Sequence, residues 1–94
     1  MTVSILSRWT AKQEDVLRIG RRAKSIYEKH GAEMRVSQVF TGPYAGQFLA
    51  AARFPDRETC GKATSTDAEY QSILAEVHQV GELHGRSIVV SLEL

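Results

Sequence analysis

The sequence predicts an α+β fold in which strands and helices follow the order βαββαβ. Two long segments repeat apolar residues every three or four positions, which is the spacing of one helix face. Four shorter segments alternate apolar and polar side chains with the period of two that is typical of strands. We therefore expect a four-stranded antiparallel sheet with both helices on one face. The expected strands lie near residues 2–9, 33–41, 47–54 and 86–94.

The first helix is predicted directly after the first strand. Thr10 and Gln13 have the spacing of a capping box, so we expect the helix to begin at Thr10. Residues 29–31, Lys-His-Gly, are typical of a helix C terminus. Between these ends the apolar stripe is long enough for about five turns.

The middle of the chain predicts a β-hairpin, with residues 42–46 as its turn. In the strand before the turn, the alternation places Phe40 on the side of the helices. In the strand after it, residues 50–52 are three alanines with weak strand propensity, which leaves a local helix possible. Phe48 and Phe54 at the ends of this segment favour a strand.

The second helix is predicted in two parts. Asp56 is a good N-cap for a short helix through about Ala63. Thr66 and Glu69 form a second capping box, and the apolar stripe that follows stops at Gly81.

The last strand is expected after a turn at residues 84–86. With this strand in place, alternation assigns one sheet face to the helices and leaves a mixed face opposite. That face combines aliphatic side chains with arginines, which is unusual for a solvated surface and favours a homodimer interface. Its diagnostic residues are Leu6, Val39, Leu49, Val89, Arg8, Arg35 and Arg53.

Composition limits the classes of function. The 94 residues predict a single domain, residues 1–94. Twelve Lys and Arg residues against eleven Asp and Glu give a net charge of +1, so no global field attracts nucleic acid or an anionic membrane. No apolar run approaches the length of a membrane span and no signal peptide is visible, which makes the cytoplasm the expected location.

Charge is divided between the two predicted helices. The first is basic and the second is acidic, and both should lie on one sheet face. We therefore expect ion pairs between them, each contributing about 0–1 kcal/mol when exposed. The candidates are Arg18, Arg21, Arg22 and Lys24 on the first helix, and Asp67, Glu69 and Glu76 on the second.

The chain resembles the dimeric α+β barrel superfamily of small ferredoxin-like proteins, which includes antibiotic-biosynthesis-type monooxygenases, muconolactone-isomerase-like proteins and heme-degrading monooxygenases. The resemblance spans the whole chain. Its local features are residues 54–56 leaving the third strand, residues 67–71 opening the second part of the second helix, and residues 85–87 before the last strand. It implies a homodimer with facing sheets and a pocket between sheet and helices, but no single reaction. The heme-degrading members use a helix histidine with an asparagine and a tryptophan, and this chain has no asparagine.

Other proteins of the same topology fit less well. An RNA-recognition domain needs aromatic residues for base stacking on its third strand, where this chain has Gln47, Leu49, Ala51 and Arg53. An acylphosphatase-like protein needs a glycine-rich phosphate loop after the first strand, where residues 9–11 are Trp-Thr-Ala. A ligand-binding regulatory domain stays open.

Five residues are candidates for chemistry. His78 lies on the flank of the second helix's apolar stripe, where it could carry a proton in a pocket between sheet and helices. The alternative is a half-buried histidine bonded to backbone. Arg8 and Arg53 could hold a carboxylate or a developing oxyanion, and Trp9 and Tyr70 could contact a ligand. No spacing of the histidines and the single cysteine suggests a metal site, and no cofactor is expected.

Two functions remain open at this point. The first is a small dimeric protein that binds a small organic ligand between its sheet and its helices. The second is a cofactor-independent monooxygenase or isomerase that acts on a small aromatic or polyketide-like compound. Whether the protein is an enzyme is not decided by the sequence.

Overall fold

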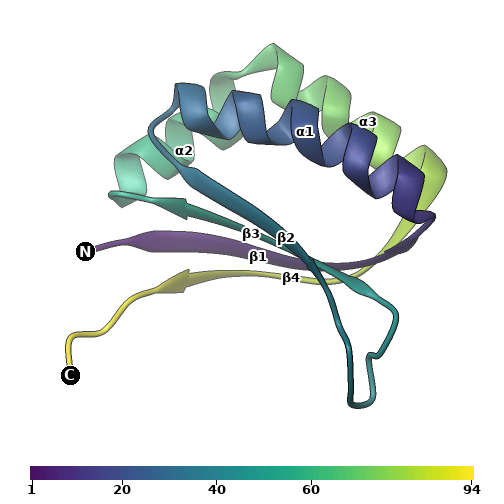
Figure 1. Cartoon of the computed structure of the whole chain (residues 1–94). Coiled ribbons are helices and arrows are strands. Elements are labelled where there is room, and N and C mark those ends of the chain that lie inside the picture. The colour runs from purple at the N-terminus through teal and green to yellow at the C-terminus, as the bar shows by residue number, and fades with distance from the viewer.

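The computed structural model describes residues 1–94 and shows one antiparallel sheet with all helices on one face (Figure 1). The strand order is β2-β3-β1-β4. The predicted ferredoxin-like α+β fold is confirmed, and the second helix is in two parts. No helix has the length and apolarity needed to cross a membrane. The elements are β1 (Val3–Ala11), α1 (Gln13–Lys29), β2 (Glu33–Gln38), β3 (Phe48–Phe54), α2 (Arg57–Thr66), α3 (Ala68–Val80) and β4 (Gly81–Val90).

The strand register fixes which side chains face the helices. Val3 pairs with Phe54 on β3 and with Val90 on β4, and paired residues share a sheet face. Val3 and Phe54 are almost fully buried, at 2% and 0% exposure. The alternation therefore predicts the two faces correctly. We call the face away from the helices the outer face; its residues include Ser4, Leu6, Arg8, Glu33, Arg35, Ser37, Leu49, Ala51, Arg53, Ser87 and Val89.

Aromatic contacts join the helices to the sheet. The Tyr27 ring of α1 meets Phe54 of β3 edge-on, with centroids 5.6 Å apart. It also meets Tyr70 of α3 edge-on, at 5.7 Å. These T-shaped contacts connect three elements within one core.

The predicted capping box of the first helix is wrong. Thr10 lies inside β1, which continues to Ala11 and pairs there with Gly81 of β4. The Thr10 hydroxyl forms a 2.6 Å hydrogen bond with Nε2 of His84. The N-cap of α1 is Lys12, which makes no side-chain cap. Pairing with a distant strand thus overrides a local signal for a helix start.

The second helix starts partly as expected. The Asp56 carboxylate accepts a 2.8 Å hydrogen bond from the backbone N–H of Thr59, which confirms it as an N-cap. The second capping box is wrong, because the N-cap of α3 is Asp67 rather than Thr66. The Asp67 carboxylate accepts from the backbone N–H groups of the next turn, and Thr66 ends α2.

The last strand begins earlier than expected. It follows α3 directly at Gly81, so residues 84–86 belong to the strand and not to a turn. Arg8 pairs with Gly85 and Trp9 pairs with Leu83, so His84 is the extra residue of a β-bulge. The strand ends at Val90, which leaves residues 91–94 outside it.

The loop between β2 and β3 is longer than expected, because β2 ends at Gln38. Phe40 is 93% exposed and does not pack toward the helices. Gly42 and Gly46 have φ of +100° and +91°, a backbone region that favours glycine. These two backbone conformations let the loop turn back toward β3.

One expected ion-pair site between the helices forms as predicted, and a second involves basic residues at the end of α1 that lie outside the predicted set. Glu76 of α3 binds both Arg18 and Arg22 of α1. Asp67 binds Nζ of Lys29 at 3.0 Å and Nε2 of His30 at 2.8 Å. The other candidates form no pair between helices: Lys24 pairs with Glu28 on its own helix, and Arg21 and Glu69 pair with nothing.

The contact that Asp67 makes between the end of α1 and the start of α3 should be sensitive to acid. Its hydrogen bond with His30, and then that with Lys29, holds the pKa of this carboxyl well below the ordinary 3.8. The pKa of Asp67 is lower in the folded protein than in the unfolded chain. The ionised carboxylate therefore stabilises the fold at pH values above the unfolded pKa, and this contribution is lost as the pH falls below about 4. We expect Asp67→Asn to lower the melting temperature at pH 7 by roughly 5 °C.

This difference between Asp67→Asn and the unmodified protein should shrink as the pH is lowered from 5 toward 2, measured by circular dichroism. Glu69→Gln is the matched control, since it removes a carboxylate two residues away that forms no ion pair. An equal loss at pH 7 in both variants would contradict the role of Asp67.

Candidate ligand-binding site

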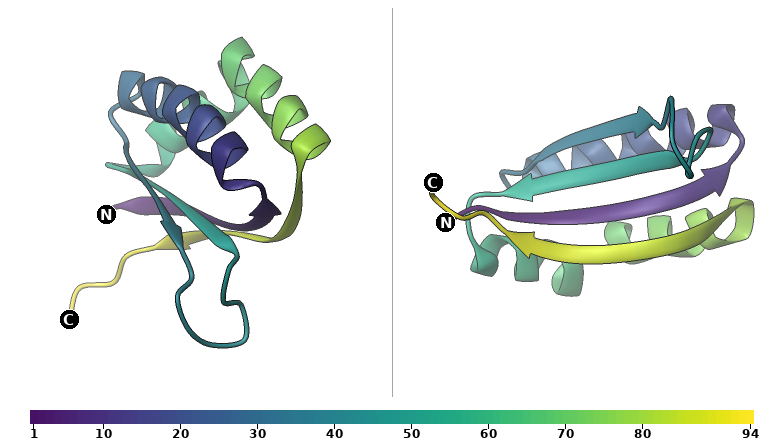
Figure 2. Two further views of the ribbon diagram at one scale, coloured as in Figure 1. Left: turned by 45° about the vertical axis from the view of Figure 1, so that its right-hand side comes forward. Right: turned by 90° about the horizontal axis from the view of Figure 1, so that it is seen from below.

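A cavity of about 170 Å³ lies between the sheet and the helices. Of its 24 lining residues, 18 are hydrophobic, so it favours an apolar guest. It is walled by β1, β2, β3 and β4 on one side and by α1 and α3 on the other. Figure 2 shows how α1 and α3 lie over the curved sheet.

Small side chains explain why this space is open. Ser7 of β1 pairs with Ala50 of β3 on the helix side of the sheet, so one row of the floor carries little volume. Ala23 of α1 also lines the cavity. Larger side chains at these positions would fill the space, as Ile and Leu side chains do in most cores.

Trp9 and His78 stand together at the edge of this cavity. Their ring centroids are 5.6 Å apart, and both residues line the space. The Trp9 indole N–H donates a 2.8 Å hydrogen bond to the Ser7 hydroxyl, which fixes the ring over the floor. His78 is exposed, so its imidazole is reached from solvent as well as from the cavity. Two predicted site residues are therefore brought together.

Tyr70 and Arg86 form the main polar contact of the lining. Tyr70 is 4% exposed, and its hydroxyl accepts a 2.9 Å hydrogen bond from the Arg86 guanidinium. Arg86 is exposed and takes part in none of the ion pairs of the molecule, so its guanidinium has no carboxylate partner and its other N–H donors are free to bind a ligand or water. Beside this contact, burial raises the pKa of Tyr27 and keeps its hydroxyl neutral.

Sequence reasoning missed Arg86 because its position was expected in a turn. A signal was present: Arg86 is in phase with Ile88 and Val90, the residues that face the helices. A charged residue in the apolar phase of a strand is a candidate for a buried contact or a site.

Arg8 and Arg53 do not line the cavity. The expectation that they act in one site with His78 is therefore wrong. Both lie on the outer face, where Arg53 is exposed. The Arg8 guanidinium lies 3.8 Å from the centroid of the Tyr44 ring, and its Nε donates a 2.8 Å hydrogen bond to Gln47. The sheet separates them from any ligand that His78 could contact.

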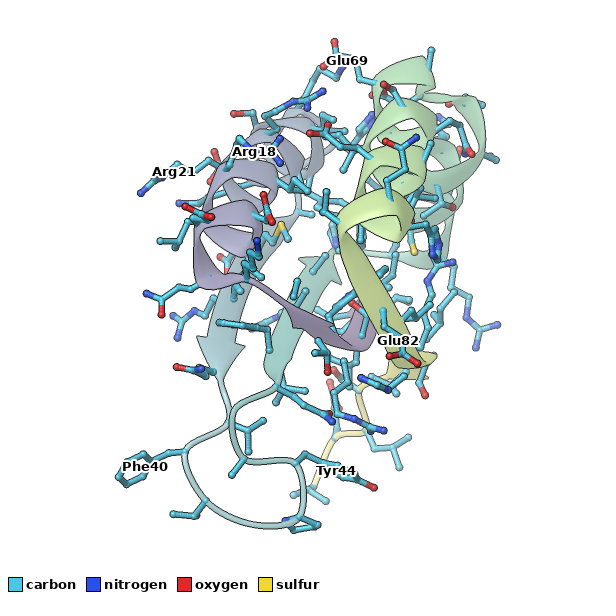
Figure 3. The ribbon with its side chains drawn as sticks, turned by 90° about the vertical axis from the view of Figure 1, so that its right-hand side faces the viewer. Arg18, Arg21, Phe40, Tyr44, Glu69 and Glu82 are labelled. Atoms are coloured by element: carbon cyan, nitrogen blue, oxygen red, sulfur yellow. The ribbon has the colours of Figure 1, made fainter.

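The helices above the cavity are connected by charge. Glu76 on α3 binds Arg18 and Arg22 on α1, and the bond with Arg18 lowers the pKa of Glu76. Figure 3 shows Arg18 on α1 near the facing helix. No group of three or more histidine, cysteine or acidic side chains is arranged to hold a metal ion.

Comparison with solved structures finds the same fold in several proteins. SnoaB, a cofactor-independent oxygenase from Streptomyces nogalater, superposes with a TM-score of 0.81 at 9% identity, over 99% of this chain and 95% of that one. The chain shares the fold of this oxygenase. A Chloroflexus aurantiacus protein provisionally described as an antibiotic biosynthesis monooxygenase has a TM-score of 0.70 at 11% identity, covering 99% and 95% of the two chains.

A Deinococcus radiodurans protein with the same provisional description has a TM-score of 0.70 at 14% identity, covering 100% and 95%. No protein-family model and no curated protein matches the sequence. At such low identity the likeness establishes the fold alone. The ferredoxin-like fold that the resemblance implies is confirmed.

Proposed function

We propose that this protein binds a small aromatic compound, about one ring in size, in the cavity between sheet and helices. The observation that carries the proposal is the apolar space of about 170 Å³. An engineered apolar cavity of about 150 Å³ is known to hold benzene, so this space suits a single ring. Trp9, Phe48 and Tyr70 supply aromatic walls.

Arg86 favours a guest with an oxygen substituent. It is the only Lys or Arg residue in the lining, and no carboxylate neutralises it. A carboxylate or phenolate oxygen on the ring would accept from its free N–H groups, beside the Tyr70 hydroxyl. The apolar ring would then lie toward Ala50 and Val77, away from water.

The only tryptophan of the chain tests this binding directly. Titration with benzoate is expected to change the fluorescence of Trp9, because that ring lines the cavity. Arg86→Met should weaken benzoate binding by about 10-fold, which corresponds to the ~1.4 kcal/mol of one lost hydrogen bond to a charged group.

Arg53→Met is the control for charge, since Arg53 lies on the outer face. Equal affinity of Arg86→Met and the unmodified protein would remove Arg86 from the site. The absence of saturable binding by benzoate, phenol and toluene would contradict the cavity proposal itself.

A second candidate function is cofactor-independent oxygenation of such a compound. The fold likeness to SnoaB and the place of His78 beside the cavity favour it. His78 would take a proton from a phenolic substrate, and the resulting electron-rich ring would reduce O₂. Oxidation of the para C–H of a phenol to a quinone C=O, with release of water, consumes one O₂ and needs no other reductant.

Oxygen uptake in the presence of a phenol with a free para position measures this activity. We expect His78→Ala to lower the rate by about 10²-fold or more, the usual contribution of a positioned general base. His84→Ala removes a histidine that lines no part of the cavity and should leave the rate unchanged. Uptake no faster than that of the probe alone would reject the oxygenase and leave the binding function in place.

We also propose that two copies of the chain associate through their outer faces. All helices lie on one face of the open four-stranded sheet, so no element of the chain forms a layer over the outer face. Leu6, Leu49 and Val89 on that face are 40%, 43% and 40% exposed. A second copy would remove this apolar surface from water.

A further inference from the structure

The loop of residues 39–47 projects from the sheet as an arm, and we use that name for it below. In Figures 1 and 2 it extends past the sheet on the side away from the helices. Its nine residues include no Asp, Glu, Lys, Arg or His. The arm thus stands beside the outer face and adds apolar surface to that side of the molecule.

Hydrogen bonds order the arm within a single chain. At its base, the Val39 N–H donates to the Gln47 carbonyl and the Gly46 N–H donates to the Val39 carbonyl, both at 2.8 Å. Arg8 attaches the arm to β1 through its bond to Gln47 and its stacking on Tyr44. An ordered arm loses little conformational entropy when it binds a partner.

Phe40 is the exposed group of this arm. It is 93% exposed, and Figure 3 shows its ring extending away from the rest of the molecule. No aromatic partner in the chain contacts it. A large aromatic side chain on an ordered projection is the kind of residue that anchors an interface.

We propose that the arm clasps a second copy of this chain, with Phe40 packed against the partner's outer face; this rests on the proposed association through that face. Three observations favour a second copy. The arm is continuous with the outer face through Arg8, which pairs with Leu49. The arm is uncharged, so it complements an apolar strip rather than a nucleic acid or an acidic peptide. The outer face supplies such a strip in Leu6, Leu49 and Val89.

Two-fold symmetry makes the arrangement reciprocal. In an isologous dimer each surface meets the same surface of the other copy, so both arms engage at once. Each copy then contributes an aromatic anchor to the other's sheet. The outer face of a single copy is therefore only part of the interface, and the partner's arm completes it.

Sedimentation equilibrium of Phe40→Ser tests the arm. We expect the Kd of the dimer to rise by about 30-fold or more, the size typical of an aromatic anchor at an interface. Because Phe40 is exposed in the single chain, the variant should keep its fold, as checked by its melting temperature in dilute solution. Leu17→Ser is the control: it removes an apolar residue of α1 that is 44% exposed on the helix side.

A second variant tests whether the arm is covered in the dimer, at concentrations chosen from the Kd of that variant. Phe40→Cys places a thiol on the arm, while the native Cys60 is 5% exposed. Its reaction with a thiol reagent should slow at least 10-fold between concentrations at which the chain is monomeric and dimeric. If Phe40→Ser leaves the Kd of the dimer unchanged and dimerisation does not slow the reaction of Phe40→Cys, the clasp is wrong and the dimer stands. A chain that stays monomeric overturns both, and neither result bears on the ligand cavity.

Discussion

Leu49→Glu is expected to turn the proposed dimer into monomers at micromolar concentrations. Leu49 lies on the inner strand β3, between Arg8 of β1 and Ser37 of β2, on the outer face. It is 43% exposed in one chain, so a glutamate there is hydrated in the monomer and the fold should persist. In the dimer the same carboxylate would lose its water, and the Arg8 guanidinium opposite it is already engaged by Gln47 and the Tyr44 ring. A buried charge without a partner typically costs about 3–5 kcal/mol, which raises the Kd by more than 100-fold.

Sedimentation velocity checks this expectation, with Leu17→Glu as the matched control on α1. The unmodified protein and the control should sediment as a particle of twice 10.5 kDa, and Leu49→Glu as one of 10.5 kDa. If the unmodified chain has the mass of a monomer, the outer face needs no partner. If Leu49→Glu still dimerises, the interface lies elsewhere.

Filling the cavity should abolish ligand binding without unfolding the protein. Ala50 lies on the helix side of β3 and lines the space. Ala50→Leu would place three more carbon atoms where the aromatic ring is proposed to lie. We expect benzoate affinity to fall about 10- to 100-fold, since overpacking of this kind costs about 1–3 kcal/mol in the complex. The melting temperature of the free protein should hold or rise, because the new side chain occupies an existing void.

Ala51→Leu is a close control for this substitution. Ala51 is the next residue of the same strand and pairs with Leu6, so its side chain points to the outer face. Its benzoate affinity should match that of the unmodified protein in the Trp9 titration. Equal weakening by both substitutions would mean that the loss comes from distortion of β3, and equal affinity in both would place the ligand outside the cavity.

The sheet was predictable because burial imposes a period of two on every strand. That period assigned Val3, Phe54 and Val90 to the helices and Leu49 to the other face, and the register agrees. The three alanines of β3 adopt the strand despite their weak propensity, because neighbours on both sides pair with them. Tertiary context here outweighs local preference.

The element boundaries were less predictable, because they depend on distant pairing. Thr10 has the local features of a helix cap, yet its backbone belongs to the ladder with β4. Around His84 a glycine suggested a turn, whereas the extra residue is accommodated as a bulge inside the strand. No pattern within a few residues distinguishes these alternatives.

The lining of the candidate cavity was predictable only in part, because it depends both on side-chain phase and on where each strand begins. Trp9, Tyr70 and His78 line the cavity, since helix and strand phases place them on the inner side. Arg8 and Arg53 do not, and the alternation that puts them on the outer face already separates them from His78. Arg86 is not predicted, because the expected turn at residues 84–86 hides its place in the strand, which begins at Gly81.

The most direct test of the central claim is a two-dimensional ¹H–¹⁵N NMR titration with benzoate. The account predicts saturable shifts concentrated at the Trp9 indole, Tyr70, Val77 and Arg86, the groups that surround the cavity. Little change is expected at Leu6 and Val89 on the outer face. Shifts confined to the outer face, or none at millimolar benzoate, would contradict the assignment of the cavity as the ligand site.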